Sequence, residues 1–241
     1  MKAFGIILAG MLALPMALFA QEKVTFTASD GFEVTADCYE SMPGRPMVVL
    51  CHQAGWSRGE YQETAQWFDA LGFNCLAVDQ RSGDEVNGVK NETAARAKAK
   101  GLPQGYLDAE PDIIAAVAWA SQHAGGPVIL VGSSYSASLA LKVAAENEQV
   151  RAVAAFSPGE YFGAKLNLGK AIDGLNKPTF ITSSKSESSK AKPLADRVSP
   201  GKITHFVPKA DGHHGSRALW TSKEGHEEYR AAFGAWISGL K

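Results

Sequence analysis

A short segment near the middle of the chain has the spacing of a turn that presents a nucleophile. The apolar run 128–131 is followed by Gly132, Ser134 and Ser136 at alternate positions. Where a strand turns directly into a helix, the central residue is strained and the residues two before and two after it must be small. Ser134 would stand clear of the sheet at a helix N-terminus, which favours a developing negative charge. This spacing predicts a nucleophilic Ser134, with Ser136 where a second glycine is commoner; the alternative is a serine-rich turn that caps the helix.

The candidate general base is a histidine near the end of the chain. His213 and His214 are adjacent just after the predicted strand 203–207, and only one of them can point inward. The His214-Gly215 pair favours His214, and His213 is the alternative. A neutral imidazole can take the serine proton and later return it to the leaving group. His52 also follows a strand, but it precedes the serine and is interpreted as a residue that orients its loop.

The candidate acid is a glutamate, because a carboxylate must fix the imidazole tautomer and offset its positive charge. Glu187 comes shortly after the predicted strand 178–182. Glu160, which follows the preceding strand 150–156, is the alternative. Either of them could instead be an ordinary surface carboxylate.

Two backbone amides are candidates for an oxyanion hole. The loop His52-Gln53-Ala54-Gly55 follows the short apolar run 47–51 and precedes a predicted helix at 61–71. A donor from such a loop usually complements the N–H of the residue after the nucleophile. The N–H groups of Gln53 and Tyr135 are therefore the predicted pair.

The elements that would position these residues alternate along the chain. Alternating apolar and polar residues at 23–29 and 32–39, around Asp30-Gly31, predict an antiparallel hairpin. Later strands alternate with helices, which predicts an α/β fold: a mostly parallel twisted sheet with helices on both faces. Parallel strand ends meet at one edge, so Ser134, Glu187 and His214 would converge there.

Loops between these elements would form the pocket walls. Segment 84–105 is polar and long, with a short helix expected at 93–100 whose charges form a solvated face. Segment 160–177 is too short for a large cap domain and predicts a minimal lid.

Composition excludes several classes of function. The 241 residues are 45% hydrophobic and 20% charged, with a formal net charge of −1, which gives no argument for nucleic acid as a partner. Cys38, Cys51 and Cys75 lie in strand-like contexts and are interpreted as buried free thiols rather than a disulfide. No metal-ligand spacing occurs, so we expect neither a metal nor another cofactor.

The first twenty residues have the pattern of a secretory signal. Met1-Lys2 is followed by an uncharged apolar run from residue 3 to residue 20 and then by Gln21-Glu22-Lys23. A basic start, an apolar middle and a small residue at the cut predict cleavage after Ala20. The mature domain would then span 21–241, be secreted or periplasmic and have no stable membrane insertion. The alternative is an uncleaved membrane anchor at 3–20.

The chain resembles the α/β-hydrolase superfamily, in particular its compact dienelactone-hydrolase-like and esterase-like members. The resemblance covers residues 24–240 and rests on the His52 loop, the segment Gly132-Ser133-Ser134-Tyr135-Ser136, Glu187 and His214-Gly215. The order serine, acid, histidine is the one that this superfamily uses. It implies a Ser134–His214–Glu187 triad.

Three functions remain open at this point. We expect a serine hydrolase that acts on a small-molecule carboxylic ester, thioester or lactone. A peptidase or amidase with the same triad is one alternative, and a non-catalytic binding protein on a hydrolase fold is another, because fold alone does not define function. The sequence leaves the substrate and the oligomeric state open.

Overall fold

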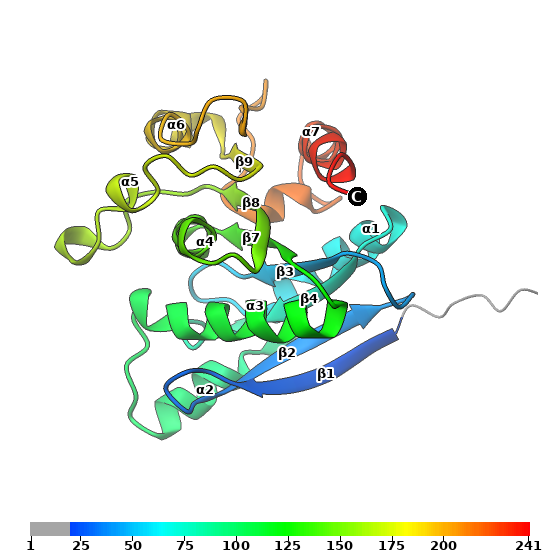
Figure 1. Cartoon of the computed structure of the whole chain (residues 1–241), viewed down its shortest axis with the longest axis vertical. Helices are drawn as coiled ribbons and strands as arrows, with labels where there is room; N and C mark the ends of the chain where they lie inside the picture. Colours follow the sequence, from blue (N-terminus) through cyan, green and yellow to red (C-terminus); the bar gives the residue numbers. More distant parts are fainter. Residues whose placement is uncertain (1–19) are drawn as a thin grey trace, which may run out of the picture.

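The computed structural model describes residues 20–241, and its strands form one large sheet and one small one. The strands of the large sheet are β1 (Ala20–Thr27), β2 (Glu33–Glu40), β3 (Met47–Cys51), β4 (Asn74–Val78), β7 (Val128–Ser133), β8 (Val150–Phe156), β9 (Thr179–Thr182) and β10 (Ile203–Phe206). Their order across the sheet is β1-β2-β4-β3-β7-β8-β9-β10 (Figure 1). In this sheet β4, β3, β7, β8, β9 and β10 run parallel to one another, and β1 and β2 add an antiparallel edge. The predicted fold class is confirmed.

The N-terminal hairpin forms around Asp30-Gly31, as predicted. β1 and β2 pair from Ala20 opposite Glu40 to Thr27 opposite Glu33. Gly31 has a φ of 78°, which a glycine adopts without the strain that a side chain would add.

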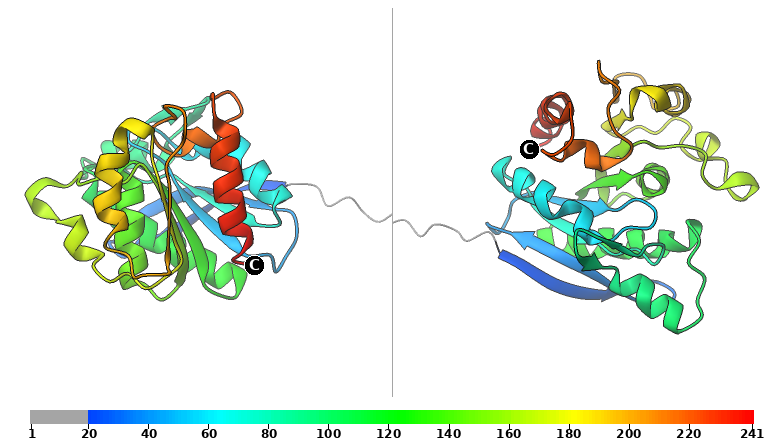
Figure 2. Two further views of the ribbon diagram at one scale, coloured as in Figure 1. Left: turned by 90° about the horizontal axis from the view of Figure 1, so that it is seen from above. Right: turned by 180° about the vertical axis from the view of Figure 1, so that it is seen from behind.

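Helices cover both faces of the large sheet (Figure 1). The α-helices are α1 (Gln62–Ala70), α2 (Glu92–Ala99), α3 (Glu110–Ala124), α4 (Tyr135–Glu146), α5 (Leu168–Ala171), α6 (Ser188–Ala195) and α7 (His226–Ser238). The 3₁₀ helices are η1 (Arg58–Tyr61), η2 (Leu107–Ala109), η3 (Gly163–Lys165), η4 (Lys185–Glu187) and η5 (Ser216–Leu219). Figure 2 shows α6 and α7 on either side of the last strands.

The buried core divides into two clusters because successive residues of a strand point to opposite faces. Val49 and Leu130 pack with residues of α3, α4 and α6. Val48 and Ile129 pack on the other face with residues of α1 and α7. Within the second cluster, the Phe233 ring of α7 lies 5.2 Å from that of Phe156 and 5.1 Å from that of Phe180, which fixes α7 against β8 and β9.

The segment 84–105 is more ordered than its polar sequence indicates. It contains a small antiparallel pair, β5 (Glu85–Val86) and β6 (Val89–Lys90), before α2. The α2 helix is not simply a solvated face, since Thr93, Ala94 and Ala97 are buried. The Thr93 hydroxyl accepts the Thr35 N–H at 2.9 Å, so a contact with β2 covers this side of the helix.

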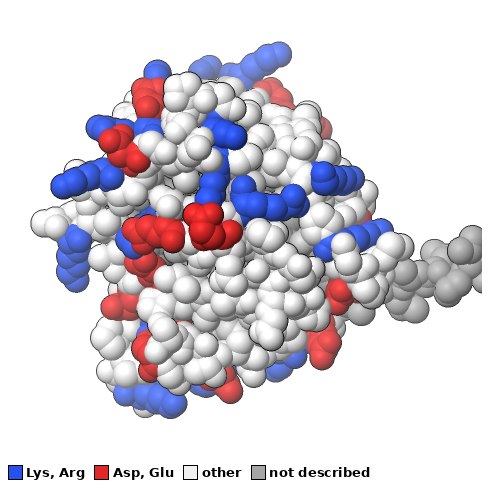
Figure 3. Space-filling view, in the orientation of Figure 1, with Lys and Arg blue, Asp and Glu red and all other residues white. Residues whose placement is uncertain are grey.

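Cys38, Cys51 and Cys75 are buried free thiols, as predicted. Within residues 20–241, no helix has the length and apolar character needed to cross a membrane. Basic and acidic side chains are interspersed on the face drawn in Figure 3. The predicted signal peptide at 1–20 lies outside the described residues except for Ala20, the first residue of β1.

Candidate active site

The turn between β7 and α4 has the strained geometry that the sequence predicts. Ser134 has φ 60° and ψ −123°, a positive φ that few residues other than glycine adopt. A Cβ on Gly132 would lie 2.6 Å from the Ala137 Cα and still closer to the Ser136 carbonyl oxygen. Only glycine therefore fits at position 132. Strain of this kind costs on the order of 1–3 kcal/mol and persists only where the surrounding structure enforces it.

Ser136 has a structural role at the position where a second glycine is commoner. Its hydroxyl donates to the Cys51 carbonyl at 2.7 Å and accepts the Ser133 N–H at 2.9 Å. The small polar side chain thus ties the turn to the end of β3. An alanine would have enough room but would lose both hydrogen bonds.

The structure brings Ser134, His214 and Glu187 together from three separate segments. His214 Nε2 lies 2.8 Å from Ser134 Oγ, and His214 Nδ1 lies 2.6 Å from Glu187 Oε1. Because an ionised carboxylate can only accept, Nδ1 carries the proton and Nε2 is free to accept the serine hydroxyl. Ser134 is buried, with 6% of its surface exposed.

The second carboxylate oxygen of Glu187 is held by two serines. Glu187 Oε2 accepts the Ser157 hydroxyl at 2.8 Å and the Ser184 hydroxyl at 2.9 Å. Burial alone would raise the pKa of this carboxyl, but the hydrogen bonds from His214, Ser157 and Ser184 lower it to about 2. Glu187 is therefore a carboxylate throughout the neutral range.

Ser157 is a site residue that the sequence analysis missed. It follows β8 with a φ of 56°, and its hydroxyl also accepts the Gly215 N–H at 3.0 Å. One side chain thus joins the acid and the histidine loop. The only sequence signal was its place at a strand end, before Pro158-Gly159.

The two alternatives for acid and base have other partners. The Glu160 carboxylate accepts the Leu168 N–H and the Gly169 N–H, each at 2.9 Å, and so holds the start of α5. The backbone N–H of His213 donates to the Tyr229 hydroxyl at 3.4 Å. Neither side chain takes part in the hydrogen bonds that join Ser134, His214 and Glu187.

The predicted oxyanion donor Gln53 is engaged elsewhere. Its N–H donates to Glu60 Oε2 at 2.8 Å, so it is not available to a substrate. Glu60 had no predicted role, because the pattern of the loop does not indicate a side-chain partner seven residues downstream. Tyr135, the other predicted donor, is the first residue of α4, where the N–H groups of a helix lack helical partners.

His52 orients its loop, as predicted, and cannot act as a base. Its Nε2 accepts the Gln80 N–H at 3.1 Å, and its Nδ1 therefore donates to the Gln53 carbonyl at 2.8 Å. Complete burial lowers the pKa of His52 to about 4, so the ring is neutral at physiological pH.

A cavity of about 700 Å³ adjoins the histidine and the acid. Segment 158–169 forms one wall, and Lys190, Leu194 and Arg197 of the α6 region form another. The Tyr161 hydroxyl in this wall donates to the Ser157 carbonyl at 2.9 Å. The short elements η3 and α5 lie in the segment that the sequence analysis predicted as a minimal lid.

One group of side chains in the described part of the chain could hold a metal ion. Ligand atoms of Cys38, Glu40 and His123 lie within 4.8 Å of one another. These residues belong to β2 and α3 and line a different cavity from the one beside His214. The serine, histidine and glutamate are therefore separate from this group.

The sheet, its helices and the strained serine turn together define an α/β hydrolase. Residues 43–186, more than half of the chain, match the family described as serine aminopeptidase, S33, and the chain belongs to this family. It is therefore a hydrolase. No curated protein sequence matches it.

Similar solved structures include several esterases. An esterase from Pyrococcus furiosus has a TM-score of 0.69 at 17% identity, over 96% of this chain and 97% of that one. A dienelactone hydrolase from Anabaena variabilis has a TM-score of 0.68 at 15% identity, over 91% and 97%. An esterase domain from Rhodothermus marinus has a TM-score of 0.62 at 15% identity, over 91% and 98%. At these identities the likeness is one of fold.

Proposed function

We propose that this protein is an exported serine hydrolase that cleaves a carboxylic ester, thioester or lactone through an acyl-enzyme on Ser134. The observation that carries the proposal is the continuous hydrogen-bonded series from Ser134 Oγ through the His214 ring to Glu187. Nucleophile, base and orienting acid in this relation activate a hydroxyl that is otherwise a poor nucleophile.

The proposed reaction has two halves. His214 Nε2 takes the Ser134 proton as Oγ attacks the carbonyl carbon, and then gives that proton to the departing alcohol, thiol or ring oxygen. A water molecule that loses its proton to His214 next attacks the acyl-enzyme, and Ser134 is regenerated. Glu187 offsets the imidazolium charge in both halves, and its pKa of about 2 keeps it ionised.

The negative oxygen of the tetrahedral intermediate needs two N–H donors. We propose Tyr135 N–H for one and Ala54 N–H, in place of Gln53, for the other. The Gln53 carbonyl accepts His52 Nδ1–H at 2.8 Å and the Trp56 N–H at 3.3 Å. The peptide unit is planar and trans, so this carbonyl fixes the Ala54 N–H in the opposite direction.

The size of the cavity favours a small acyl substrate. About 700 Å³ lies within the range of pockets that bind small molecules. A peptidase or amidase with the same three residues is the second candidate, favoured by the description of the family to which the chain belongs. An amide would require firmer protonation of the leaving amine by His214. A binding protein without activity is disfavoured because the nucleophile, base and acid are all present and in contact.

The test is active-site labelling. A fluorophosphonate probe is expected to modify Ser134, and Ser134→Ala should abolish labelling and lower turnover of ester substrates by several orders of magnitude. Mass spectrometry of the labelled peptide identifies the modified residue. Modification of Ser133 or Ser136 with Ser134 untouched would overturn the assignment. A panel of esters, lactones and aminoacyl amides then separates the two candidate activities.

A further inference from the structure

Glu60 is a fully buried carboxylate that joins two segments of the candidate active site. It lies on η1 and has no exposed surface. Its Oε1 accepts the Ser216 hydroxyl at 2.5 Å, and its Oε2 accepts the Gln53 N–H at 2.8 Å. Burial of a carboxylate is costly unless the group is hydrogen-bonded, and these two contacts offset that cost.

Both segments that Glu60 holds belong to the proposed machinery. Gln53 precedes Ala54, the proposed oxyanion donor, and Ser216 lies two residues after His214. The Ser216 N–H also donates to Ser133 Oγ at 2.9 Å, next to the nucleophile. One carboxylate group therefore fixes the spacing between the oxyanion loop, the base and the nucleophile turn.

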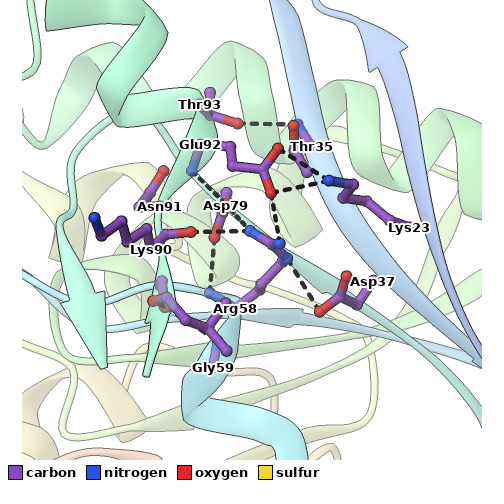
Figure 4. A network of polar contacts seen from close by, with 12 residues as sticks. Lys23, Thr35, Asp37, Arg58, Gly59, Asp79, Lys90, Asn91, Glu92 and Thr93 are labelled. Carbon is purple, nitrogen blue, oxygen red and sulfur yellow. Dashed lines mark hydrogen bonds and ion pairs between the residues drawn. The ribbon is translucent and has the colours of Figure 1, made fainter. Parts of the chain in front are cut away.

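The helix that carries Glu60 is itself firmly anchored (Figure 4). Arg58, two residues earlier, forms ion pairs with Asp37 of β2 at 3.0 Å, with Asp79 at 2.5 Å and with Glu92 of α2 at 2.8 Å. On the other side, Trp220 Nε1–H donates to the Glu60 carbonyl at 2.9 Å. The position of the Glu60 carboxyl group is thus set from both sides.

We propose that Glu60 is a positioning residue of the hydrolase, whose carboxylate aligns the oxyanion loop with His214. This inference rests on the proposed function. It assigns to the site a second carboxylate, which is fully buried and touches neither the substrate nor the imidazole ring.

The charge of Glu60 depends on pH in the working range. Burial raises the pKa of its carboxyl to about 7, against the hydrogen bonds from Ser216, Gln53 and Ser133 and the attraction of His214. Three other titratable groups interact with it or its loop: Tyr61 and Cys51, which stay neutral because burial raises the pKa of each, and neutral His52. When the carboxyl is protonated, one of its oxygens becomes a donor, so its hold on the Gln53 N–H and the Ser216 hydroxyl weakens as the pH falls through this value.

The first test replaces the carboxylate by its neutral isostere. Glu60→Gln should lower kcat roughly tenfold to a hundredfold with little change in KM, as expected for misalignment of reacting groups. It should also move the acidic limb of the kcat/KM profile to lower pH, because the ionisation of Glu60 no longer contributes to that limb. Glu63→Gln is the matched control. Glu63 lies on α1, directly after η1, and its contacts lie outside the oxyanion loop: it accepts the Thr221 N–H at 2.8 Å and pairs with Arg230 at 2.7 Å.

A second variant keeps the charge and removes one of its partners. Ser216→Ala deletes the hydroxyl that lowers the pKa of Glu60, so the acidic limb should move to higher pH, opposite to the shift in Glu60→Gln. A purely structural role would lower activity in both variants without moving the limb, and that result would overturn the inference. If Glu60→Gln does not fold, the shift in Ser216→Ala alone decides. Full turnover by Ser134→Ala, in contrast, would refute the proposed function itself.

Discussion

At the scale of single residues, the two oxygens of Glu187 have different tasks. Oε1 binds the histidine and Oε2 binds two serine hydroxyls, so the carboxylate cannot rotate without losing a hydrogen bond on each side. The imidazole is thereby held in the tautomer that leaves Nε2 facing Ser134. Both oxygens of Glu160, the other candidate acid, instead accept hydrogen bonds from backbone amides of α5.

This difference gives a direct comparison of the two glutamates. Glu187→Gln should fold but present an N–H or a weak acceptor to His214 Nδ1. The expected loss in kcat is on the order of 10⁴, as for the Asp-to-Asn change in a Ser-His-Asp triad. Because the pKa of Glu187 is about 2, the acidic limb of the profile near neutrality should not derive from this carboxyl. Steady-state kinetics across pH 4 to 9 measures both effects.

Glu160→Gln is the control for this comparison and should change kcat by less than about threefold, since side chains outside the working unit contribute little to the chemical step. Should Glu160→Gln be the crippling change, the acid lies after β8 and the assignment of Glu187 is wrong. If neither matters while His214→Ala does, the site works as a dyad.

At the scale of elements, sequence patterns could predict the arrangement because strand ends meet at one edge of a parallel sheet. The hairpin at Asp30-Gly31 and the glycine–serine turn at Gly132 carry their conformation in local spacing. Glu60 and Ser157 could not be predicted, because each joins segments far apart in the chain. Local spacing also could not show that the Gln53 N–H is engaged by Glu60, because it does not give the orientation of η1 relative to the loop that precedes it.

The α7 helix provides a test of packing on the face of the sheet that it covers. Phe233 is fully buried and contacts the rings of Phe68, Phe156 and Phe180. Phe233→Ala should lower the free energy of unfolding by about 3–5 kcal/mol, from lost burial and the cavity left behind. Urea denaturation followed by circular dichroism measures it.

Ile114→Ala is the matched control for this substitution. Ile114 lies on α3 with 39% of its surface exposed, so its truncation should cost less than about 1 kcal/mol. Equal losses in the two variants would mean that α7 does not pack on the sheet as described.

At the scale of the whole molecule, the candidate active site and the beginning of the described chain lie at different parts of the large sheet. Ser134, Glu187 and His214 gather beyond β7, β9 and β10, whereas the described chain begins in β1, the strand at the other edge of the sheet (Figure 1). The proposal of export rests on the N-terminal sequence and the proposal of catalysis on these three side chains, so each can be tested without the other.

The last prediction concerns that N-terminal segment. Gln21 pairs with Tyr39, and its Nε2 donates to Asp37 at 2.9 Å, so a chain that starts at Gln21 keeps this edge contact of the hairpin. We expect the exported protein to have the mass of residues 21–241, because a basic start, an apolar run and a small residue precede the cut. Intact-mass measurement of the soluble extracytoplasmic fraction tests this. Ala20→Pro is expected to block cleavage and retain the full chain at the membrane, whereas Ala17→Ser, inside the apolar run, should be processed normally. Recovery of the unmodified chain with residues 1–20 in the membrane fraction would instead establish the anchor.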